Sequence, residues 1–340
     1  MNAVSDAPEG AMLEVRNASK KFVKSLDLAA KIAVKLGANA REEVVHAVDG
    51  VSLSVARGEV VGLVGESGCG KSTLGRMVAG ILPPTSGEIA YKGKAVAAKG
   101  TEEGDRAALQ IQMIFQDPFA SLNPRMRVED IIGEAAVYHN MCAASDISSY
   151  VSDVMNRVGL DPDYRRRYPH QFSGGQRQRI GIARALAVKP EFLVCDEAIA
   201  ALDVSIQAQV INLFMDLRQD LDLTYLFISH DLSVVEHISD RVVIMYLGRV
   251  VEVAPTDELF DNKPNHPYTH ALLNEVPRLD MRGLDYQPVS GEIPSPIDPP
   301  PGCHFHPRCP HATARCSAER PALREIAPGR LSACHLNDVS

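Results

Sequence analysis

The sequence predicts an α/β fold with a mostly parallel β-sheet. Short apolar runs of strand length recur along the chain and alternate with longer stretches of helical periodicity, which is typical of strands covered by helices on both faces. The first of these runs, residues 60–64, is followed by a glycine-rich loop and a helical stretch. Phosphate-binding loops occur in this order of elements.

The N-terminal part predicts two strands separated by an inserted helix. Residues 13–15 and 48–55 alternate apolar and polar side chains, as half-buried strands do. Between them, residues 25–36 carry apolar side chains on one helical face, and Gly37 follows as a helix stop. We therefore expect about residues 23–46 to form a surface insertion.

The remaining elements alternate along the chain. The expected strands are residues 111–115, 192–195, 223–229 and 242–246, and the expected helices are residues 72–82, 151–159, 175–187 and 205–220. We find no internal repeat and expect one such domain, residues 11–255. Beyond it the pattern weakens, and residues 286–302 hold six prolines. This composition predicts a linker or extended segment within a small C-terminal extension, residues 256–340.

Length and composition exclude several classes of protein. The chain has 340 residues, 45% of them hydrophobic, which argues against intrinsic disorder. Its 35 Lys and Arg against 43 Asp and Glu give a net charge of −8, which argues against a generally basic nucleic-acid binder. No apolar run approaches the roughly 20 residues that cross a bilayer. Because residues 1–10 also lack a secretion signal, we expect a cytosolic chain.

The glycine-rich loop fits the Walker A pattern G-x-x-x-x-G-K-[ST]. Its glycines let backbone N–H groups converge on phosphates, Lys71 supplies a positive charge to the β and γ oxygens, and Ser72 can bind Mg²⁺. An ordinary glycine-rich turn is the alternative, but a strand before the loop and a helix after it favour ATP binding. The predicted ATP contacts are Gly65, Glu66, Ser67, Gly68, Cys69, Gly70, Lys71, Ser72 and Thr73.

An apolar strand that ends in two acids predicts a Walker B site. Residues 192–195 lead into Asp196 and Glu197. Asp196 is placed to hold Mg²⁺, and Glu197 can polarise the attacking water. This pattern is weak evidence alone, but it becomes strong beside a Walker A loop.

A third motif resembles the signature of ABC ATPases. Phe172 precedes Ser-Gly-Gly-Gln just ahead of the Walker B strand, although the family usually has Leu at the first position. The resemblance implies that this motif contacts the ATP bound to a partner cassette. The residues concerned are Ser173, Gly174, Gly175 and Gln176.

Four single residues match further elements of the ABC family. Gln116 resembles the Q-loop glutamine, which contacts Mg²⁺ and the attacking water, and His230 resembles the switch histidine at the γ-phosphate. Asp203 resembles the D-loop aspartate, and Phe22 the aromatic residue that stacks on adenine. Without this context, Gln116 predicts only a capping side chain and His230 only a surface histidine.

The resemblance extends to ATPases of dipeptide and oligopeptide importers, over nearly the whole chain. It rests on the insertion after Phe22, on the Phe-Gln-Asp-Pro sequence of residues 115–118, on His-Pro-Tyr-Thr at residues 266–269 and on the cysteine-rich tail. Such importers have two types of ATPase subunit, and the start of the helix after the Walker A loop is more similar to the second, F-type subunit than to the first. The implied fold is an ABC-type nucleotide-binding domain with a helical signature subdomain, about residues 117–185.

The resemblance also implies partners and a location. ATP is held between two cassettes, so we expect a second ABC ATPase subunit, two transmembrane permeases and an extracytoplasmic solute-binding protein, and no nucleic acid. The chain is expected on the cytoplasmic face of the bacterial inner membrane. Peptides are the expected cargo, with nickel, oligosaccharides or opines as alternatives.

Four of the seven cysteines lie near the C-terminus, at Cys303, Cys309, Cys316 and Cys334. Their spacing, C-x₅-C-x₆-C-x₁₇-C, matches neither zinc fingers nor the common ferredoxin runs. From spacing alone, a metal site and unligated structural cysteines remain equally open. The resemblance implies a structural [4Fe–4S] cluster. Zn²⁺ on the same four residues is the alternative, with His304, His306, His311 and His335 as possible substitute ligands.

Two other functions are weighed. A soluble ABC ATPase in DNA repair or translation is disfavoured. Repair ATPases of this family usually carry a long coiled coil between the Walker A loop and the signature, and its translation factors carry two cassettes, whereas this sequence shows neither feature. A redox-responsive regulator with a secondary ATPase is the weaker alternative, and it rests on the cysteines alone.

Overall fold

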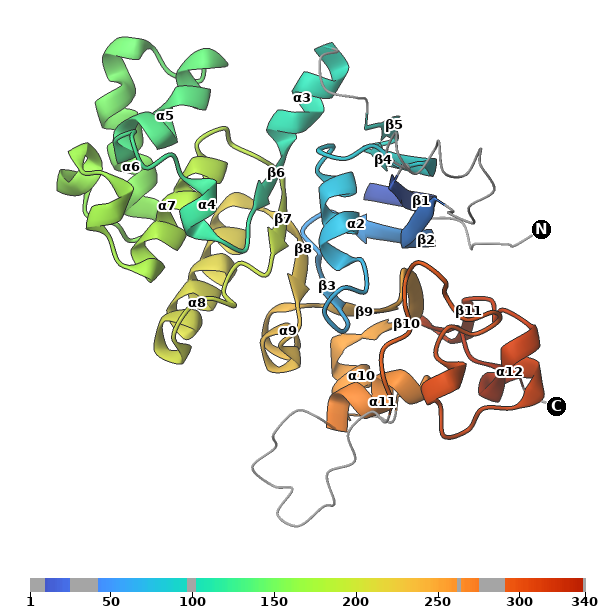
Figure 1. Cartoon of the computed structure of the whole chain (residues 1–340). Helices are drawn as coiled ribbons and strands as arrows, with labels where there is room; N and C mark the ends of the chain where they lie inside the picture. The colour runs from blue at the N-terminus through green and yellow to red at the C-terminus, as the bar shows by residue number, and fades with distance from the viewer. Residues whose placement is uncertain (1–9, 25–41, 97–101, 262–263, 275–290, 339–340) are drawn as a thin grey trace, which may run out of the picture.

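The computed structural model describes residues 10–24, 42–96, 102–261, 264–274 and 291–338. Two β-sheets and several helices make up the body of the molecule, with a helical lobe on one side and the C-terminal extension at the opposite end (Figure 1). No helix among these residues is both long and apolar enough to cross a membrane.

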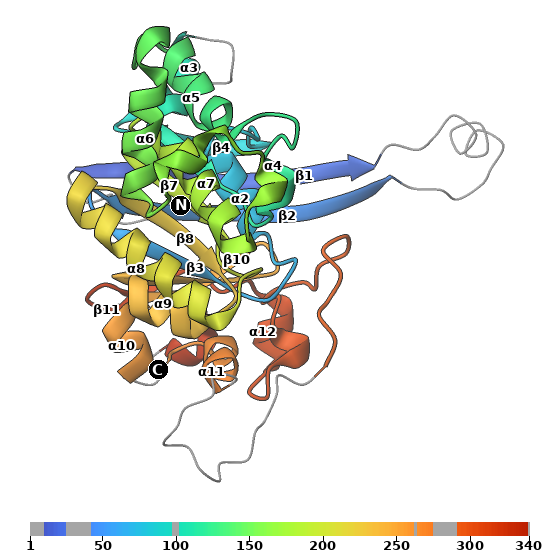
Figure 2. The same ribbon diagram turned by 90° about the vertical axis from the view of Figure 1, so that its left-hand side faces the viewer.

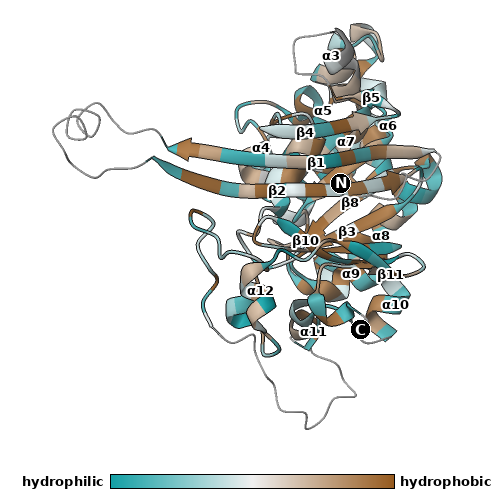
Figure 3. Ribbon diagram, turned by 90° about the vertical axis from the view of Figure 1, so that its right-hand side faces the viewer, coloured by the Kyte–Doolittle hydropathy of each residue, from teal (hydrophilic) through white to brown (hydrophobic). Residues whose placement is uncertain are grey.

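Five parallel strands form the centre of the larger sheet, in the order β9-β3-β8-β7-β6. Their bounds are Val60–Val64 for β3, Ile111–Ile114 for β6, Phe192–Asp196 for β7, Thr224–Ser229 for β8 and Arg241–Tyr246 for β9. Every residue of β3, β7 and β8 is buried, and β3 and β8 are largely hydrophobic in Figure 3. The predicted parallel sheet is confirmed, and each strand predicted for this sheet agrees with the observed one to within one residue at either end.

Helices pack against the strands of this sheet. The four that match predicted helices are α2 (Lys71–Val78), α6 (Ile147–Arg157), α7 (Gly174–Leu186) and α8 (Val204–Leu221). Helix α2 ends four residues before its predicted end because Gly80, at φ +66°, turns the chain. The N–H groups of Gly80 and Ile81 then bond back to Met77 and Arg76.

The helical lobe is built around α5, α6 and α7, whose apolar faces share one core with β7 and β8. The sequence did not predict α5, because its apolar residues recur without a clear cap. The remaining helices of the body are α3 (Glu102–Gln110), α4 (Pro118–Ser121), α5 (Val128–Tyr138), α9 (Leu232–Ile238) and the 3₁₀ turns Ala144–Asp146, Pro162–Arg166 and Pro169–Gln171.

The smaller sheet is antiparallel, in the order β2-β1-β4-β5. Its strands are β1 (Ala11–Lys24), β2 (Glu43–Ala56), β4 (Ser86–Tyr91) and β5 (Lys94–Ala95). Strands β1 and β2 pair from Ala11↔Ala56 to Lys24↔Glu43 and project from the body as a long ribbon (Figure 2). Both ends of the expected insertion therefore belong to strands. The predicted helix at residues 25–36 lies outside the described residues.

The C-terminal extension is tied to the larger sheet. Strand β10 (Arg249–Pro255) pairs with β9 and with β12 (Arg330–Ser332), and β12 pairs with β11 (Arg324–Ala327). The other elements are α10 (Thr256–Asp261), α11 (Pro267–Asn274), α12 (Ala314–Ala318) and the 3₁₀ turns His306–Arg308 and Cys334-capped His335–Asn337. The extension thus adds β11 and β12 to the sheet that carries the phosphate loop.

Two glycines give a matched test of packing in the body. A Cβ at Gly62 in β3 would lie 2.5 Å from Val235 Cγ1 and 3.0 Å from Ser239 Oγ, whereas one at Gly181 in α7 would meet nothing within 4 Å. We expect Gly62→Ala to lower the free energy of unfolding by about 1–3 kcal/mol through overpacking. Gly181→Ala is expected to raise it by up to about 1 kcal/mol. Urea unfolding measures both, and equal effects would contradict this packing.

Candidate active site

The phosphate loop joins β3 to α2 and leaves no room for side chains at two glycines. A Cβ at Gly65 would lie 2.1 Å from the carbonyl oxygen of Met245, and one at Gly70 would lie 2.0 Å from that of Ala47. Gly70 also has φ +106°, where glycine is favoured. Because Gly70 directly precedes α2 and offers no capping side chain, the first N–H groups of the helix can face an anion.

Lys71 is buried inside this loop, with 4% of its surface exposed. Its Nζ donates hydrogen bonds to the carbonyl oxygens of Gly65, at 2.7 Å, and Glu66, at 3.0 Å. These bonds hold a positive charge where the phosphates of a nucleotide would lie.

Ser72 and Asp196 come together at the first turn of α2 and the end of β7. The Ser72 Oγ donates to the Asp196 Oδ1 at 2.7 Å. Burial raises the pKa of the Asp196 carboxyl, and the bond from Ser72 opposes that rise. A hydroxyl and a buried carboxylate side by side form an oxygen ligand set suited to Mg²⁺.

Three predicted residues meet at the carboxylate of Glu197. Gln116, which follows β6, donates from Nε2 to Glu197 Oε2 at 2.6 Å. His230, which follows β8, has its Nδ1 3.4 Å from Glu197 Oε1. Glu197 itself has φ +48°, and its N–H bonds to the carbonyl of Ile228 at 3.0 Å. The carboxyl ends of β6, β7 and β8 thus bring together the groups expected to handle the γ-phosphate and water.

The signature motif starts α7 at the surface. Ser173 is exposed and caps the helix, with its Oγ accepting from the Gln176 N–H at 3.3 Å and its own N–H donating to Gln176 Oε1 at 3.0 Å. A Cβ at Gly175 would lie 2.5 Å from Ile206 Cγ2, so α7 lies close to the start of α8. Asp203 occupies the position before α8 and is also exposed. The predicted signature and D-loop residues therefore share one accessible surface.

Phe22 lies on β1, opposite Val45 of β2, and 43% of its surface is exposed. The Nζ of Lys20 is 5.6 Å from its ring centroid. Because Gly70 packs against Ala47, two residues along β2 from Val45, the ribbon runs beside the phosphate loop. The adenine-stacking role of Phe22 remains a prediction.

Comparisons with known proteins show to which family this chain belongs. Models described as ABC transporter and as oligopeptide/dipeptide transporter, C-terminal region, match residues 48–200 and 251–316. The chain is 53% identical over 296 residues to the oligopeptide transport ATP-binding protein AppF of Bacillus subtilis, covering 86% of this chain and 90% of that protein. The chain belongs to the ATP-binding subunits of oligopeptide and dipeptide ABC importers.

Other similar proteins support the same family assignment. The dipeptide transport ATP-binding protein DppF of Haemophilus influenzae is 49% identical over 302 residues, covering 88% of this chain and 92% of that protein. Among solved structures, cbiO1 from Clostridium perfringens, part of the ABC transporter complex cbiONQ, has a TM-score of 0.61 at 28% identity over 75% of this chain and 92% of that chain. The predicted ABC-type fold, ATPase activity and F-type peptide-importer family are confirmed. The alternative of a repair or translation ATPase is therefore set aside.

Two residues of this importer ATPase contact the phosphate loop without having been predicted. The hydroxyl of Tyr268 accepts a hydrogen bond from the Glu66 N–H at 2.9 Å. Arg308 donates from Nη1 and Nη2 to the two carboxylate oxygens of Glu66, at 2.7 and 2.9 Å. Both residues lie in the part of the chain that matches the oligopeptide transporter C-terminal model. The His-Pro-Tyr-Thr sequence was a visible motif, but no sequence signal pointed to Arg308.

The four C-terminal cysteines line one small cavity of about 20 Å³, together with His266 and Phe305. Burial raises the pKa values of Cys303, Cys309 and Cys334, the last to about 11. Among the described residues, no group of three or more His, Cys, Asp or Glu side chains is placed to hold a metal ion as it stands.

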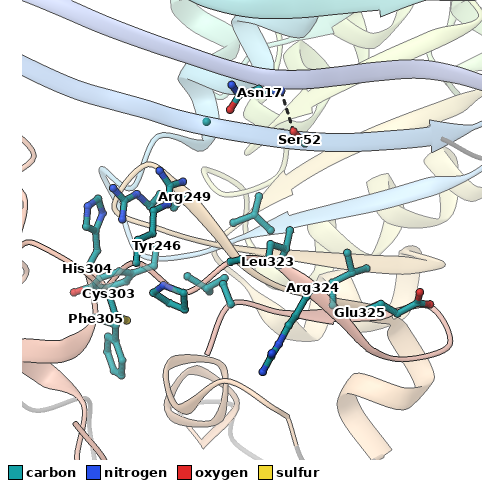
Figure 4. A pocket seen from close by; sticks show the side chains of 18 residues that line it. Asn17, Ser52, Tyr246, Arg249, Cys303, His304, Phe305, Leu323, Arg324 and Glu325 are labelled. Atoms are coloured by element: carbon teal, nitrogen blue, oxygen red, sulfur yellow. Dashed lines mark hydrogen bonds between the residues drawn. The ribbon is translucent and has the colours of Figure 1, made fainter. Parts of the chain in front are cut away.

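A larger cavity, about 1080 Å³, separates the β1–β2 ribbon from the C-terminal extension (Figure 4). Arg249 and Arg320 line it, and both face Asp49, at 2.7 and 3.6 Å. Cys303 lines this cavity as well as the cysteine pocket. None of the predicted ATP contacts lines it, so we place the nucleotide at the phosphate loop.

Proposed function

We propose that the groups around the phosphate loop hydrolyse ATP with the roles that their sequence motifs predict. In this family the chain is the ATPase of a peptide importer, and the observation that carries the assignment is the convergence of Gln116 and His230 on Glu197. The Lys71 ammonium binds the β and γ oxygens, and the helix N-terminus adds N–H donors. Ser72 and Asp196 would hold Mg²⁺, which supplies positive charge to the phosphates.

Glu197 acts as the base in this scheme. Its carboxylate orients water and accepts the proton as the water attacks the γ-phosphorus. The Gln116 amide fixes one carboxylate oxygen of Glu197, while His230 stands beside the other and is 57% exposed. Removing the proton within a hydrogen-bonded site favours attack over an unassisted reaction.

We infer that one chain supplies half of each of two ATP sites. Ser173 and Asp203 are exposed on the same surface, as expected of residues that contact a nucleotide on another cassette. A second ABC ATPase subunit would face the chain head to tail. ATP binding would close the pair, and hydrolysis would reopen it to drive the permeases.

The proposed assembly adds two permeases and a solute-binding protein, and it places the chain at the inner face of the cytoplasmic membrane. Tagging the chain, extracting it in mild detergent and identifying its companions by mass spectrometry tests this. We expect two permeases, a second ATPase and a solute-binding protein. Recovery of ribosomal or DNA-bound proteins without membrane subunits would overturn the proposed assembly. Uptake assays with peptides, nickel, oligosaccharides and opines then decide the cargo, for which we propose peptides.

We also propose that Cys303, Cys309, Cys316 and Cys334 hold a [4Fe–4S] cluster. The support is the gathering of all four thiols around one pocket, together with His266. His266 is fully buried, and burial lowers its pKa to about 3, so the ring is neutral. Its Nδ1 accepts from the Tyr268 N–H at 3.1 Å, which leaves the proton on Nε2.

The Nε2–H of His266 favours a sulfur atom as its hydrogen-bond acceptor in this pocket. That atom is buried and has no hydrogen-bond partner among the described residues. An N–H can donate to a thiolate or sulfide, but in this tautomer it cannot ligate zinc. Hydrogen bonds to sulfur are a common feature around iron–sulfur clusters. The four thiolates would hold the cluster, which would staple an extension that has little core of its own.

Elemental analysis of anaerobically purified protein distinguishes the metals. We expect about four iron and four acid-labile sulfide per chain, as a [4Fe–4S] cluster requires, and loss of most of the iron in Cys316→Ser. Cys142→Ser, outside the pocket, should keep the iron. One zinc per chain without sulfide would show the alternative, and neither metal would contradict both.

A further inference from the structure

The C-terminal extension makes hydrogen bonds to Glu66 of the phosphate loop. Arg308 binds both oxygens of its carboxylate, and the Tyr268 hydroxyl accepts from its backbone N–H. The side chain of Arg308 is only 5% exposed and that of Glu66 20%. The contact is therefore a two-point ion pair, largely shielded from water, joined to a hydrogen bond on the same residue.

A layer of aromatic rings connects this contact with the cysteine pocket. The ring centroids of Tyr246 and Tyr268 lie 4.6 Å apart, and Phe305 lies 5.2 and 5.4 Å from them. The Arg308 guanidinium carbon lies 5.8 Å from the Tyr246 centroid and 6.0 Å from that of Phe305. Figure 4 shows Phe305 and its neighbour Cys303 beside Tyr246 of β9. The layer packs as one unit, so displacement of one ring disturbs the others.

The same two segments supply both sites. The 3₁₀ turn His306–Arg308 lies between Cys303 and Cys309, so Arg308 extends from the cysteine segment itself. In the other segment, His266 lines the cysteine pocket while Tyr268, two residues later, holds the loop. Each segment thus has one residue at the pocket and one at Glu66.

The negative charge of Glu66 explains why a cation is placed at this contact. A carboxylate within a loop that binds a triphosphate repels the ligand, because like charges a few ångströms apart disfavour one another in a partly buried site. Arg308 neutralises that charge and holds the carboxylate on the side of the extension. Lys71 meanwhile bonds the Glu66 carbonyl from inside the loop, at 3.0 Å.

We propose that the C-terminal extension sets the conformation and charge of the phosphate loop, with Arg308 and Tyr268 as positioning residues. A well-ordered cysteine pocket then strengthens ATP binding. By thermodynamic reciprocity, bound ATP stabilises the pocket and slows chemical modification of its thiols. The link to pocket occupancy rests on the proposed metal or cluster, whereas the role of Arg308 does not.

The first test is a double-mutant cycle on MgATP binding, in full-length protein carrying Glu197→Gln so that ATP is not consumed. We expect Arg308→Gln to weaken binding about tenfold, because it leaves the Glu66 charge bare. Adding Glu66→Gln should recover at least about fivefold of that loss. Arg57→Gln is the matched control, since Arg57 lies before β3, at the end opposite the phosphate loop, pairs at the surface with Asp222 and should bind ATP like the parent. No recovery in the double variant, or no loss in Arg308→Gln, would overturn the role of Arg308.

The second test measures reciprocity at the pocket. The protein is first treated with a chelator, which is then removed. Alkylation of the four pocket thiols by a maleimide is followed by mass spectrometry with and without MgATP. We expect MgATP to slow alkylation about fivefold in the parent but less than about twofold in Tyr268→Phe, which removes one hydroxyl and keeps the ring. Equal rates with and without MgATP in the parent would overturn the coupling. Iron, sulfide and zinc measured on the same preparation before the chelator is added show separately whether the proposed cofactor is present.

Discussion

Replacing Glu197 by Gln is expected to leave ATP bound and to lower turnover by about 10²–10⁴-fold. That range is the usual contribution of a positioned general base. The amide has nearly the same size, and its carbonyl oxygen can still accept the hydrogen bond that Gln116 donates at 2.6 Å. It cannot take the proton of the attacking water. Lys71, Ser72 and Asp196 remain in place, so nucleotide affinity should change little.

Release of phosphate and equilibrium binding of ATP together measure this prediction. Glu191→Gln is the matched control, because Glu191 directly precedes β7 and its carboxylate pairs at the surface with Lys92. A surface ion pair of this kind contributes about 0–1 kcal/mol to stability, so this variant should turn over normally. Parent-like turnover in Glu197→Gln would remove Glu197 from the role of base.

Replacing Lys71 by Ala is expected to weaken ATP binding by about 100-fold or more. Hydrogen bonds to a charged group contribute about 1.5–3 kcal/mol each, and at least two to phosphate oxygens would be lost. The variant also leaves the carbonyl groups of Gly65 and Glu66 without the ammonium that bonds them at 2.7 and 3.0 Å. The loop would therefore lose both its charge and part of its internal support.

Calorimetric titration with MgATP measures the loss. Lys92→Ala, which removes the other half of the surface pair with Glu191, is the matched lysine control and should bind ATP normally. Binding by Lys71→Ala within about threefold of the parent would show that the ammonium does not reach the phosphates.

The parts of the fold that sequence could predict are those set by local pattern. Strand β3 was predicted at its observed bounds because a wholly buried parallel strand is a continuous apolar run. Helix α7 was predicted to within one residue from its helical periodicity, and the capping box that Ser173 and Gln176 form accounts for its observed start. The candidate site residues Lys71, Asp196 and Glu197 could be predicted for a related reason: their motifs lie at the ends of such elements.

Other features depend on contacts that local pattern does not record. Strands β11 and β12 are short and half-exposed, and they form because β10 offers an edge to pair with. Strand β1 was predicted too short because bulges between Val15 and Lys21 break its alternation. The pairing of Arg308 with Glu66 spans 242 residues of sequence, and each side chain alone resembles an ordinary surface charge.

Peptide uptake into proteoliposomes tests the central claim most directly, since the claim is that ATP hydrolysed at Glu197 powers import. The chain is reconstituted with its partner ATPase, permeases and solute-binding protein, and uptake of labelled peptide is followed beside phosphate release. We expect uptake to require ATP and to fall together with hydrolysis in Glu197→Gln. Uptake that continues unchanged in that variant would contradict the account.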